Sequence, residues 1–106
     1  MIEREKIYLD PDLILPSLAE ILAIPRNDLS QIINTHTGQN FYDFINSYRV
    51  KEVKKLINDP EKNHLTLLAL ALDAGFNSKA TFNAAFKKHT SMTPTQYKKN
   101  NGVVVP

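Results

Sequence analysis

The chain has 106 residues, of which 42% are hydrophobic and 23% are charged, and it contains no cysteine. This length and composition predict one globular domain with a single modest core. The missing cysteine excludes disulfides and thiolate metal sites, and the short apolar runs exclude a membrane span. The mixed charges of Met1–Lys6 are not typical of a signal peptide.

The positive charge lies mostly in the second half of the chain. Residues 1–53 hold 5 Lys and Arg against 8 Asp and Glu, whereas residues 54–106 hold 8 against 3. A basic half indicates an anionic partner, most commonly nucleic acid, although a solvated lysine surface gives the same pattern. Charge alone therefore leaves both interpretations open.

Helical periodicity dominates the chain, and no stretch alternates apolar and polar residues long enough to predict a strand. The predicted helices cover about residues 2–9, 15–22, 26–36, 41–58, 67–74, 79–89 and 94–99. The breaks between them are marked by Asp10-Pro11, Ile24-Pro25, Gly38, Asp59-Pro60 and Gly75. Thr66, Ser78 and Thr93 are candidate N-caps, because a hydroxyl can accept from the free N–H groups of a first turn.

The apolar residues of these helices form stripes that we expect to face the core. In the first half they are Leu18, Ile21, Leu22, Leu29, Ile32 and Ile33. On the long helix and beyond it they are Phe41, Phe44, Ile45, Tyr48, Val53, Leu56, Ile57, Phe82, Ala85 and Phe86. The expected fold class is therefore all-α with about seven helices, and the tail 100–106 has little to hold it.

The chain repeats itself. The pattern of residues 29–38 returns at an offset of 53, and that of residues 18–24 returns at an offset of 52. Each repeat reads as a short helix, a tight turn and a second helix, which is the helix-turn-helix pattern of homeodomain-like folds. We expect one unit over about 8–40, a linker helix over 41–58 and a second unit over 65–99, all within one domain, 1–106.

Several stretches resemble the C-terminal DNA-binding domain of AraC-type (AraC/XylS) transcription regulators. In the first unit they are residues 17–20 (SLAE), 29–33 (LSQII) and 37–41 (TGQNF), and residues 48–50 (YRV) resemble the start of the second half of the family's linker helix. In the second unit they are residues 71–78 (ALDAGFNS), 82–83 (FN), 86–88 (FKK) and 92–97 (MTPTQY). The resemblance spans about residues 8–99.

This resemblance implies a bacterial regulator's DNA-binding domain, normally joined to a sensing or dimerisation domain that is absent here. The chain is then a fragment of a longer cytoplasmic, nucleoid-associated or membrane-tethered regulator, with RNA polymerase as a possible partner. Arg49 resembles a family arginine that ties helices together. The departures from the family pattern are Ile14 for a polar N-cap, Leu68 and Ala69 for polar residues, Ala84 for a polar base reader, and Ser91 for glycine.

The second helix of each unit is the candidate recognition helix, because the DNA major groove admits one α-helix. Base contacts are expected from the faces opposite the apolar stripes. They come from Asn27, Asp28, Ser30, Gln31 and Asn34 in the first unit, and from Ser78, Lys79, Ala80, Asn83 and Ala84 in the second. Amides suit adenine, Asp28 suits cytosine, Lys79 suits guanine, and alanines suit the thymine methyl.

Phosphate contacts supply affinity without sequence information. We expect them from Ser17, Arg26, Thr66, Lys87 and Lys88. A solvated helix face is the alternative for all these residues. The lack of positive charge near Asp28 makes that alternative strongest in the first unit.

No cofactor, metal or catalytic group is expected. His36 and His89 occupy matching helix ends but lack partners at metal-ligand spacing, so helix-end packing or dipole complementation is the simpler interpretation. His64 reads as a surface residue. No nucleophile–base pair or glycine-rich phosphate loop indicates an enzyme. The competing function is a helical protein-interaction module with degenerate DNA binding, and salt dependence separates the two.

Overall fold

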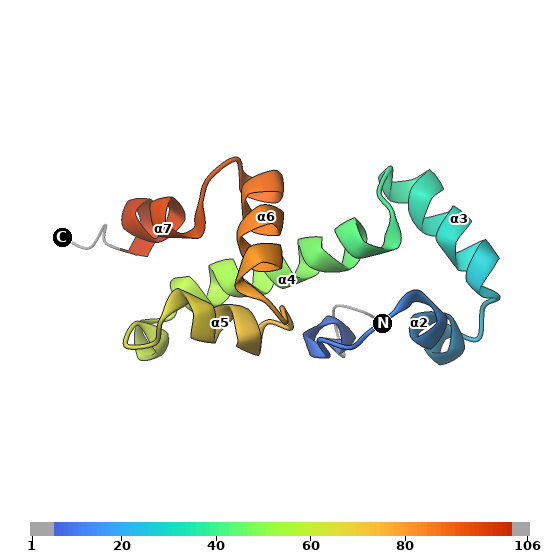
Figure 1. Ribbon diagram of the computed structural model, residues 1–106, viewed down its shortest axis with the longest axis horizontal. Coiled ribbons are helices and arrows are strands. Elements are labelled where there is room, and N and C mark those ends of the chain that lie inside the picture. Colours follow the sequence, from blue (N-terminus) through green and yellow to red (C-terminus); the bar gives the residue numbers. More distant parts are fainter. Residues whose placement is uncertain (1–5, 103–106) are drawn as a thin grey trace.

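The computed structural model of the chain describes residues 6–102, and this part is entirely helical (Figure 1). Six α-helices are joined by short connections: α2 (Leu15–Leu22), α3 (Arg26–Thr37), α4 (Phe41–Ile57), α5 (Leu67–Asp73), α6 (Lys79–Thr90) and α7 (Pro94–Tyr97). Short 3-10 turns form η1 (Ile7–Leu9) and η2 (Pro60–Lys62), and a π-helical turn forms η3 (Lys98–Gly102). The predicted all-α class is confirmed.

The first and the last predicted helices have bounds that differ from those in the structure. A first helix running through residues 2–9 is wrong at Lys6, whose left-handed backbone (φ 52°) interrupts a helix and leaves only η1; residues 1–5 lie outside the described part. At the other end, the last helix does not stop near Lys99. Residues 98–102 continue it as the π-helical turn η3, and residues 103–106 lie outside the described part.

The helix starts follow the predicted chemistry. The hydroxyls of Thr66, Ser78 and Thr93 accept from backbone N–H groups of the first turns of α5, α6 and α7. The side chain of Asn40 does the same for α4, accepting from the N–H of Asp43 at 2.8 Å. In contrast, the N-cap positions of α2 and α3 carry Ile14 and Pro25, which make no side-chain cap bond.

The sequence repeat is a structural repeat. α3 and α6 each have 12 residues, and both end on a threonine whose hydroxyl donates to the carbonyl four residues back, at 2.6 Å for Thr37 and 2.7 Å for Thr90. The next residue is left-handed in both units, with φ 69° at Gly38 and φ 63° at Ser91. Only glycine adopts that conformation without a steric penalty, so Ser91 carries a strain that Gly38 avoids.

We expect Ser91→Gly to raise the free energy of unfolding by about 0.5–1 kcal/mol, because the strained Cβ is removed. Urea denaturation followed by helix circular dichroism would measure the change. Ala84→Gly is the matched control: it also removes a Cβ from α6, but from an exposed helical position, where about 1 kcal/mol should be lost. A Ser91→Gly protein less stable than the parent would contradict the strain.

The molecule is long, 50 × 23 × 23 Å, and its core is divided in two. One buried cluster belongs to the first unit: Tyr8, Leu13, Leu18, Ala19, Leu29, Ile33, Phe41 and Ile45. The other belongs to the second unit: Val50, Val53, Ile57, Leu70, Ala71, Ala74, Phe76, Phe82, Ala85 and Phe86. The prediction of a single core is therefore wrong, because α4 gives its first half to one cluster and its second half to the other.

Ile21 and Ile32 are exceptions to the predicted stripes. Their side chains are 56% and 44% exposed. The repeat explains Ile32: its counterpart Ala85 is buried, because α4 precedes the second unit and packs along α6. In the described residues the first unit is preceded only by η1, which packs on α4 instead, with the ring of Tyr8 stacked on Tyr48 at 5.6 Å.

The two units meet at Arg49, in the middle of α4. The side chain is 7% exposed; its Nε donates to the carbonyl of Tyr8 at 2.7 Å, and a terminal nitrogen donates to the carbonyl of Asp10 at 2.9 Å. Burial lowers the pKa of Arg49 from its usual value. Gly75, in the turn before α6, packs against the same carbonyl of Tyr8 and against the Arg49 side chain. The structural role predicted for Arg49 is confirmed.

Candidate nucleic-acid interface

Two helices of the repeat, α3 and α6, present polar faces to solvent. In the view of Figure 1, α6 crosses α4 near its middle and α3 lies beyond the end of α4 that begins at Phe41. Among the described helices, α4 contributes residues to both buried clusters, so it helps to set the distance between α3 and α6. A 50 Å molecule is long enough for two readers about 34 Å apart, which is one turn of DNA.

The outward face of α3 is polar and carries little positive charge. Leu29 and Ile33 are buried, and the residues opposite them are all exposed: Asn27, Asp28, Ser30, Gln31 and Asn34. Thr35 is also exposed and lines a shallow hollow of about 360 Å³ with Asp28 and Gln31. Thr35 was absent from the predicted set, although it lies four residues after Gln31 and so on the same helix face.

The outward face of α6 is more basic. Lys79, Ala80, Asn83, Ala84 and Lys87 are exposed, whereas Phe82, Ala85 and Phe86 are buried. Ser78 is only half exposed, and its hydroxyl is engaged: it accepts from the N–H of Thr81 at 3.1 Å and donates to the Thr81 hydroxyl at 2.9 Å. A contact from Ser78 to a base would therefore compete with its capping role.

The starts of three helices surround a hollow of about 330 Å³ in the second unit. Its polar lining comes from Thr66 before α5, from Lys79 and Asn83 on α6, and from Thr95 on α7. Thr95 was also absent from the predicted set. It is exposed beside Lys79 because α7 begins where α6 presents its first turn.

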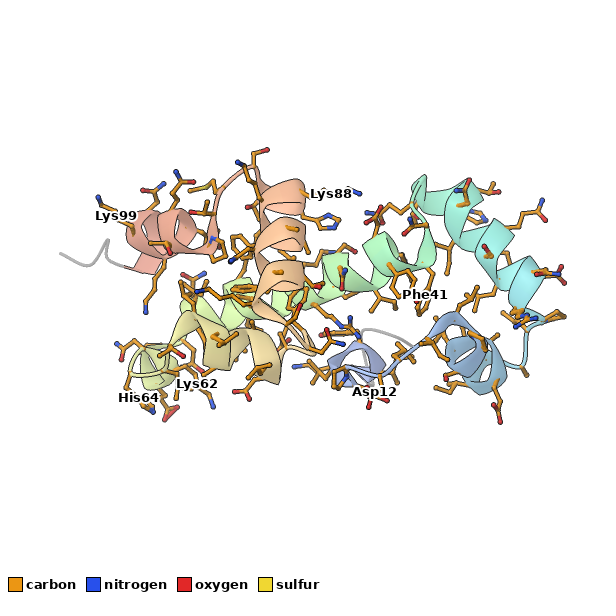
Figure 2. The ribbon with its side chains drawn as sticks, in the orientation of Figure 1. Asp12, Phe41, Lys62, His64, Lys88 and Lys99 are labelled. Carbon is orange, nitrogen blue, oxygen red and sulfur yellow. The ribbon has the colours of Figure 1, made fainter. Side chains whose placement is uncertain are left out.

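The predicted phosphate contacts differ in their surroundings. Arg26 and Lys87 are exposed, and Ser17 is half exposed in the first turn of α2. Lys88 extends from α6 to the start of α4, where its Nζ lies 2.6 Å from Asp43 Oδ2 (Figure 2). That ion pair holds Lys88 in the free protein, so Lys87 is the better placed of the two for a phosphate.

The matching histidines behave differently. His36 is exposed, whereas His89 packs between α6 and α4, and its Nε2 is buried without a hydrogen-bond partner in the described part. Burial lowers the pKa of His89, opposed by the charge of Asp43 and assisted by Lys88 and Lys54. Burial thus disfavours the charged form of His89, which is the form that would complement the helix dipole. His64 is exposed in the loop after η2 (Figure 2).

Within residues 6–102, no group of three His, Cys, Asp or Glu side chains could hold a metal ion. No helix of this part is long and apolar enough to cross a membrane. The features that remain are two outward helix faces with amide, methyl and ammonium groups, one in each unit joined by α4.

A family model described as a helix-turn-helix domain matches residues 18–100. An uncharacterized HTH-type transcriptional regulator of Staphylococcus aureus is 30% identical over 93 residues, which are 88% of this chain but only 12% of that protein. The chain thus spans about an eighth of the length of that relative.

Solved structures agree with the sequence matches. The C-terminal domain of the two-component response regulator yesN from Fusobacterium nucleatum superposes with a TM-score of 0.73 at 30% identity, covering 89% of this chain and 88% of that one. The C-terminal domain of AraT, a response regulator from Geobacillus stearothermophilus, gives a TM-score of 0.76 at 28% identity, covering 90% and 76%.

Proposed function

Because the chain belongs to the AraC-type family of helix-turn-helix DNA-binding domains, we propose that it binds double-stranded DNA sequence-specifically, with α3 and α6 in successive segments of the major groove. This is a family of transcription regulators and not of enzymes. The observation that carries the proposal is the structural repeat: two 12-residue helices with exposed polar faces, one in each of the two units that α4 joins.

The two units contribute unequally in this proposal. Lys79 and Lys87 give α6 the ammonium groups that attract phosphate, and Asn83 lies between them on the same helix. On α3, Arg26 is offset by Asp28, which leaves Asn27, Gln31 and Asn34 to read base edges. The second unit therefore supplies most of the affinity, and the first unit adds sequence information. Ser17 and Thr66 add contacts to phosphates at the groove edges.

The contacts at Arg49 fix the two units relative to each other, so that the two recognition helices bind DNA together. Arg49 holds the segment at Tyr8 and Asp10, which belongs to the first unit, and the turn at Gly75, which belongs to the second, packs on it. When one recognition helix binds, the other is then already placed near the next groove segment. This raises its effective concentration and hence the combined affinity.

The whole regulator is proposed to contain a sensing or dimerisation domain beyond this chain, and to act on RNA polymerase at promoters in the bacterial cytoplasm. The Staphylococcus relative supports a longer protein, because this chain covers only 12% of its length.

A second candidate function is a protein-interaction module with degenerate DNA binding. It is favoured by Asp28 on the outward face of α3 and by Leu68 and Leu72 on α5, which are 42% and 52% exposed. Apolar docking depends little on salt, whereas a protein that neutralises phosphates loses affinity steeply as salt rises.

Selection from a random pool of ~20-bp duplexes, followed by sequencing at low and moderate salt, tests the proposal. We expect a motif with two blocks about 10 bp apart. A single block would mean that one unit reads alone, which would contradict the two-groove arrangement. Failure to retain any DNA at low salt would reject DNA binding by this chain and favour the interaction module.

Lys87→Ala and Gln31→Ala should weaken binding in different ways. Lys87→Ala should weaken binding to specific and unrelated duplexes alike and flatten the slope of log affinity against log salt by about 0.9, because one phosphate contact is lost. Gln31→Ala should keep that slope and lose discrimination at one base pair, by about 1–3 kcal/mol. Fluorescence anisotropy titrations across salt would measure both.

The matched control is Lys55→Ala, which removes one exposed lysine from α4 and not from a recognition helix. A salt slope that falls equally for Lys55→Ala and Lys87→Ala would reject the assignment of Lys87 to a phosphate.

A further inference from the structure

The outward faces of the two recognition helices share one kind of chemistry. Their most outward side chains are amides or methyl groups: Asn27, Gln31 and Asn34 on α3, and Ala80, Asn83 and Ala84 on α6. All six are exposed. A helix face of this composition offers paired donor–acceptor groups and small apolar surfaces, and few of the double donors that guanine requires.

Two cations that could otherwise read guanine are engaged elsewhere and do not lie on these faces. Arg49 is buried and donates to two backbone carbonyls and to the side chain of Asn46. Lys88 is held by Asp43 at 2.6 Å. The remaining cations near the readers are Arg26 and Lys79, at the first residues of α3 and α6, and Lys87, in the last turn of α6. Of these cations, Lys79 is the one expected to reach guanine, and Arg26 and Lys87 are the ones expected to contact phosphates.

Each base pair presents its own pattern in the major groove. Adenine offers an acceptor and a donor that match an Asn or Gln amide, and thymine offers a methyl group that suits Ala. Guanine offers two acceptors and is read mainly by Arg or Lys. Asp28 and Lys79 are exceptions among the outward groups. The carboxylate of Asp28 accepts from the cytosine amino group and accommodates one G·C pair in the block under α3, and Lys79 accommodates one under α6.

We propose that the two blocks of the cognate DNA are rich in A·T pairs, with the block under α3 read through adenine edges and the block under α6 read largely through thymine methyl groups. This inference rests on the proposed DNA binding. It adds the class of sequence bound and divides the chemistry of reading between the two units.

Base analogues placed in one block at a time test the division. The selected duplex is prepared with deoxyuridine for thymidine, which removes only the methyl group, or with 7-deazaadenine for adenine, which removes only the N7 acceptor. Deoxyuridine under α6 should weaken binding about fourfold for each methyl group contacted. 7-Deazaadenine under α3 should weaken it roughly 2- to 13-fold, the effect of one hydrogen bond. Each analogue in the other block should have a smaller effect.

The protein side of the test is Gln31→Ala. If the amide reads adenine, this variant should be insensitive to 7-deazaadenine at the base that Gln31 contacts, while deoxyuridine under α6 keeps its full effect. An equal penalty in parent and variant would overturn the assignment. If neither analogue weakened binding to an A·T-rich site, the assignment would also be overturned, because the site would then be selected by the shape of its minor groove.

The outcomes separate this inference from the proposed function. A two-block motif rich in G·C pairs would overturn the A·T inference and leave two-groove DNA binding intact. Absence of any enriched motif and of DNA retention would overturn both.

Discussion

Gly75→Ala is expected to be among the most damaging single-methyl changes in this protein, lowering the free energy of unfolding by about 2–6 kcal/mol. A Cβ at this position would overlap the carbonyl oxygen of Tyr8 and lie 2.9 Å from Arg49 Nε and 3.0 Å from Leu9 Cα. The backbone φ of +103° adds strain for any residue with a side chain. A domain of this size has only about 5–15 kcal/mol of stability.

Thermal and urea unfolding would measure the effect, and we expect the melting temperature of Gly75→Ala to fall by at least about 8 °C. Gly38→Ala is the control. It also places a Cβ on a left-handed glycine (φ +69°), but with nothing within 4 Å, so only the conformational cost of about 1–2 kcal/mol remains. Equal losses in the two variants would show that crowding at the joint contributes nothing.

Arg49→Met should destabilise the protein by about 1–3 kcal/mol and also relax its preference for one spacing between DNA blocks. Methionine fills a similar volume and avoids the cost of burying a charge, but it removes the Arg49 donor from the buried carbonyl of Tyr8. The carbonyl of Asp10 also loses Arg49 but keeps the N–H of Leu13 at 3.2 Å. The lost hydrogen bond to the Tyr8 carbonyl costs about 1–3 kcal/mol. The segment that joins the first unit to the middle of α4 then loses its attachment.

The spacing effect is measured with duplexes whose two blocks are moved apart by one or two base pairs. The parent should bind the shifted duplexes much more weakly, whereas Arg49→Met should discriminate less among them. Lys55→Met removes the same charge from an exposed site on the same helix and should keep the parent's spacing preference. An unchanged preference in folded Arg49→Met would mean that the joint does not orient the units.

Much of the local structure follows from short-range chemistry, which is why it is predictable. The hydroxyls of Thr66, Ser78 and Thr93 cap their helices, Gly38 ends α3 in the left-handed conformation, and α3 begins at the predicted residue. The repeat is also visible in the sequence, because two copies of one supersecondary unit need apolar residues at the same positions. The outward residues of α3 and α6 follow from the same periodicity.

The all-α class, the two helix-turn-helix units and most of the residues that their helices turn to solvent can be predicted from the sequence without a structure. These depend on contacts within a few residues along the chain. Three features instead follow from tertiary packing: the core divides in two, Ile32 is exposed while Ala85 is buried, and Lys88 pairs with Asp43. These depend on which element covers each helix. The periodicity of the sequence does not show this, because α4 is placed against α6 by contacts between residues distant in sequence, such as Asp43 and Lys88, which are 45 positions apart.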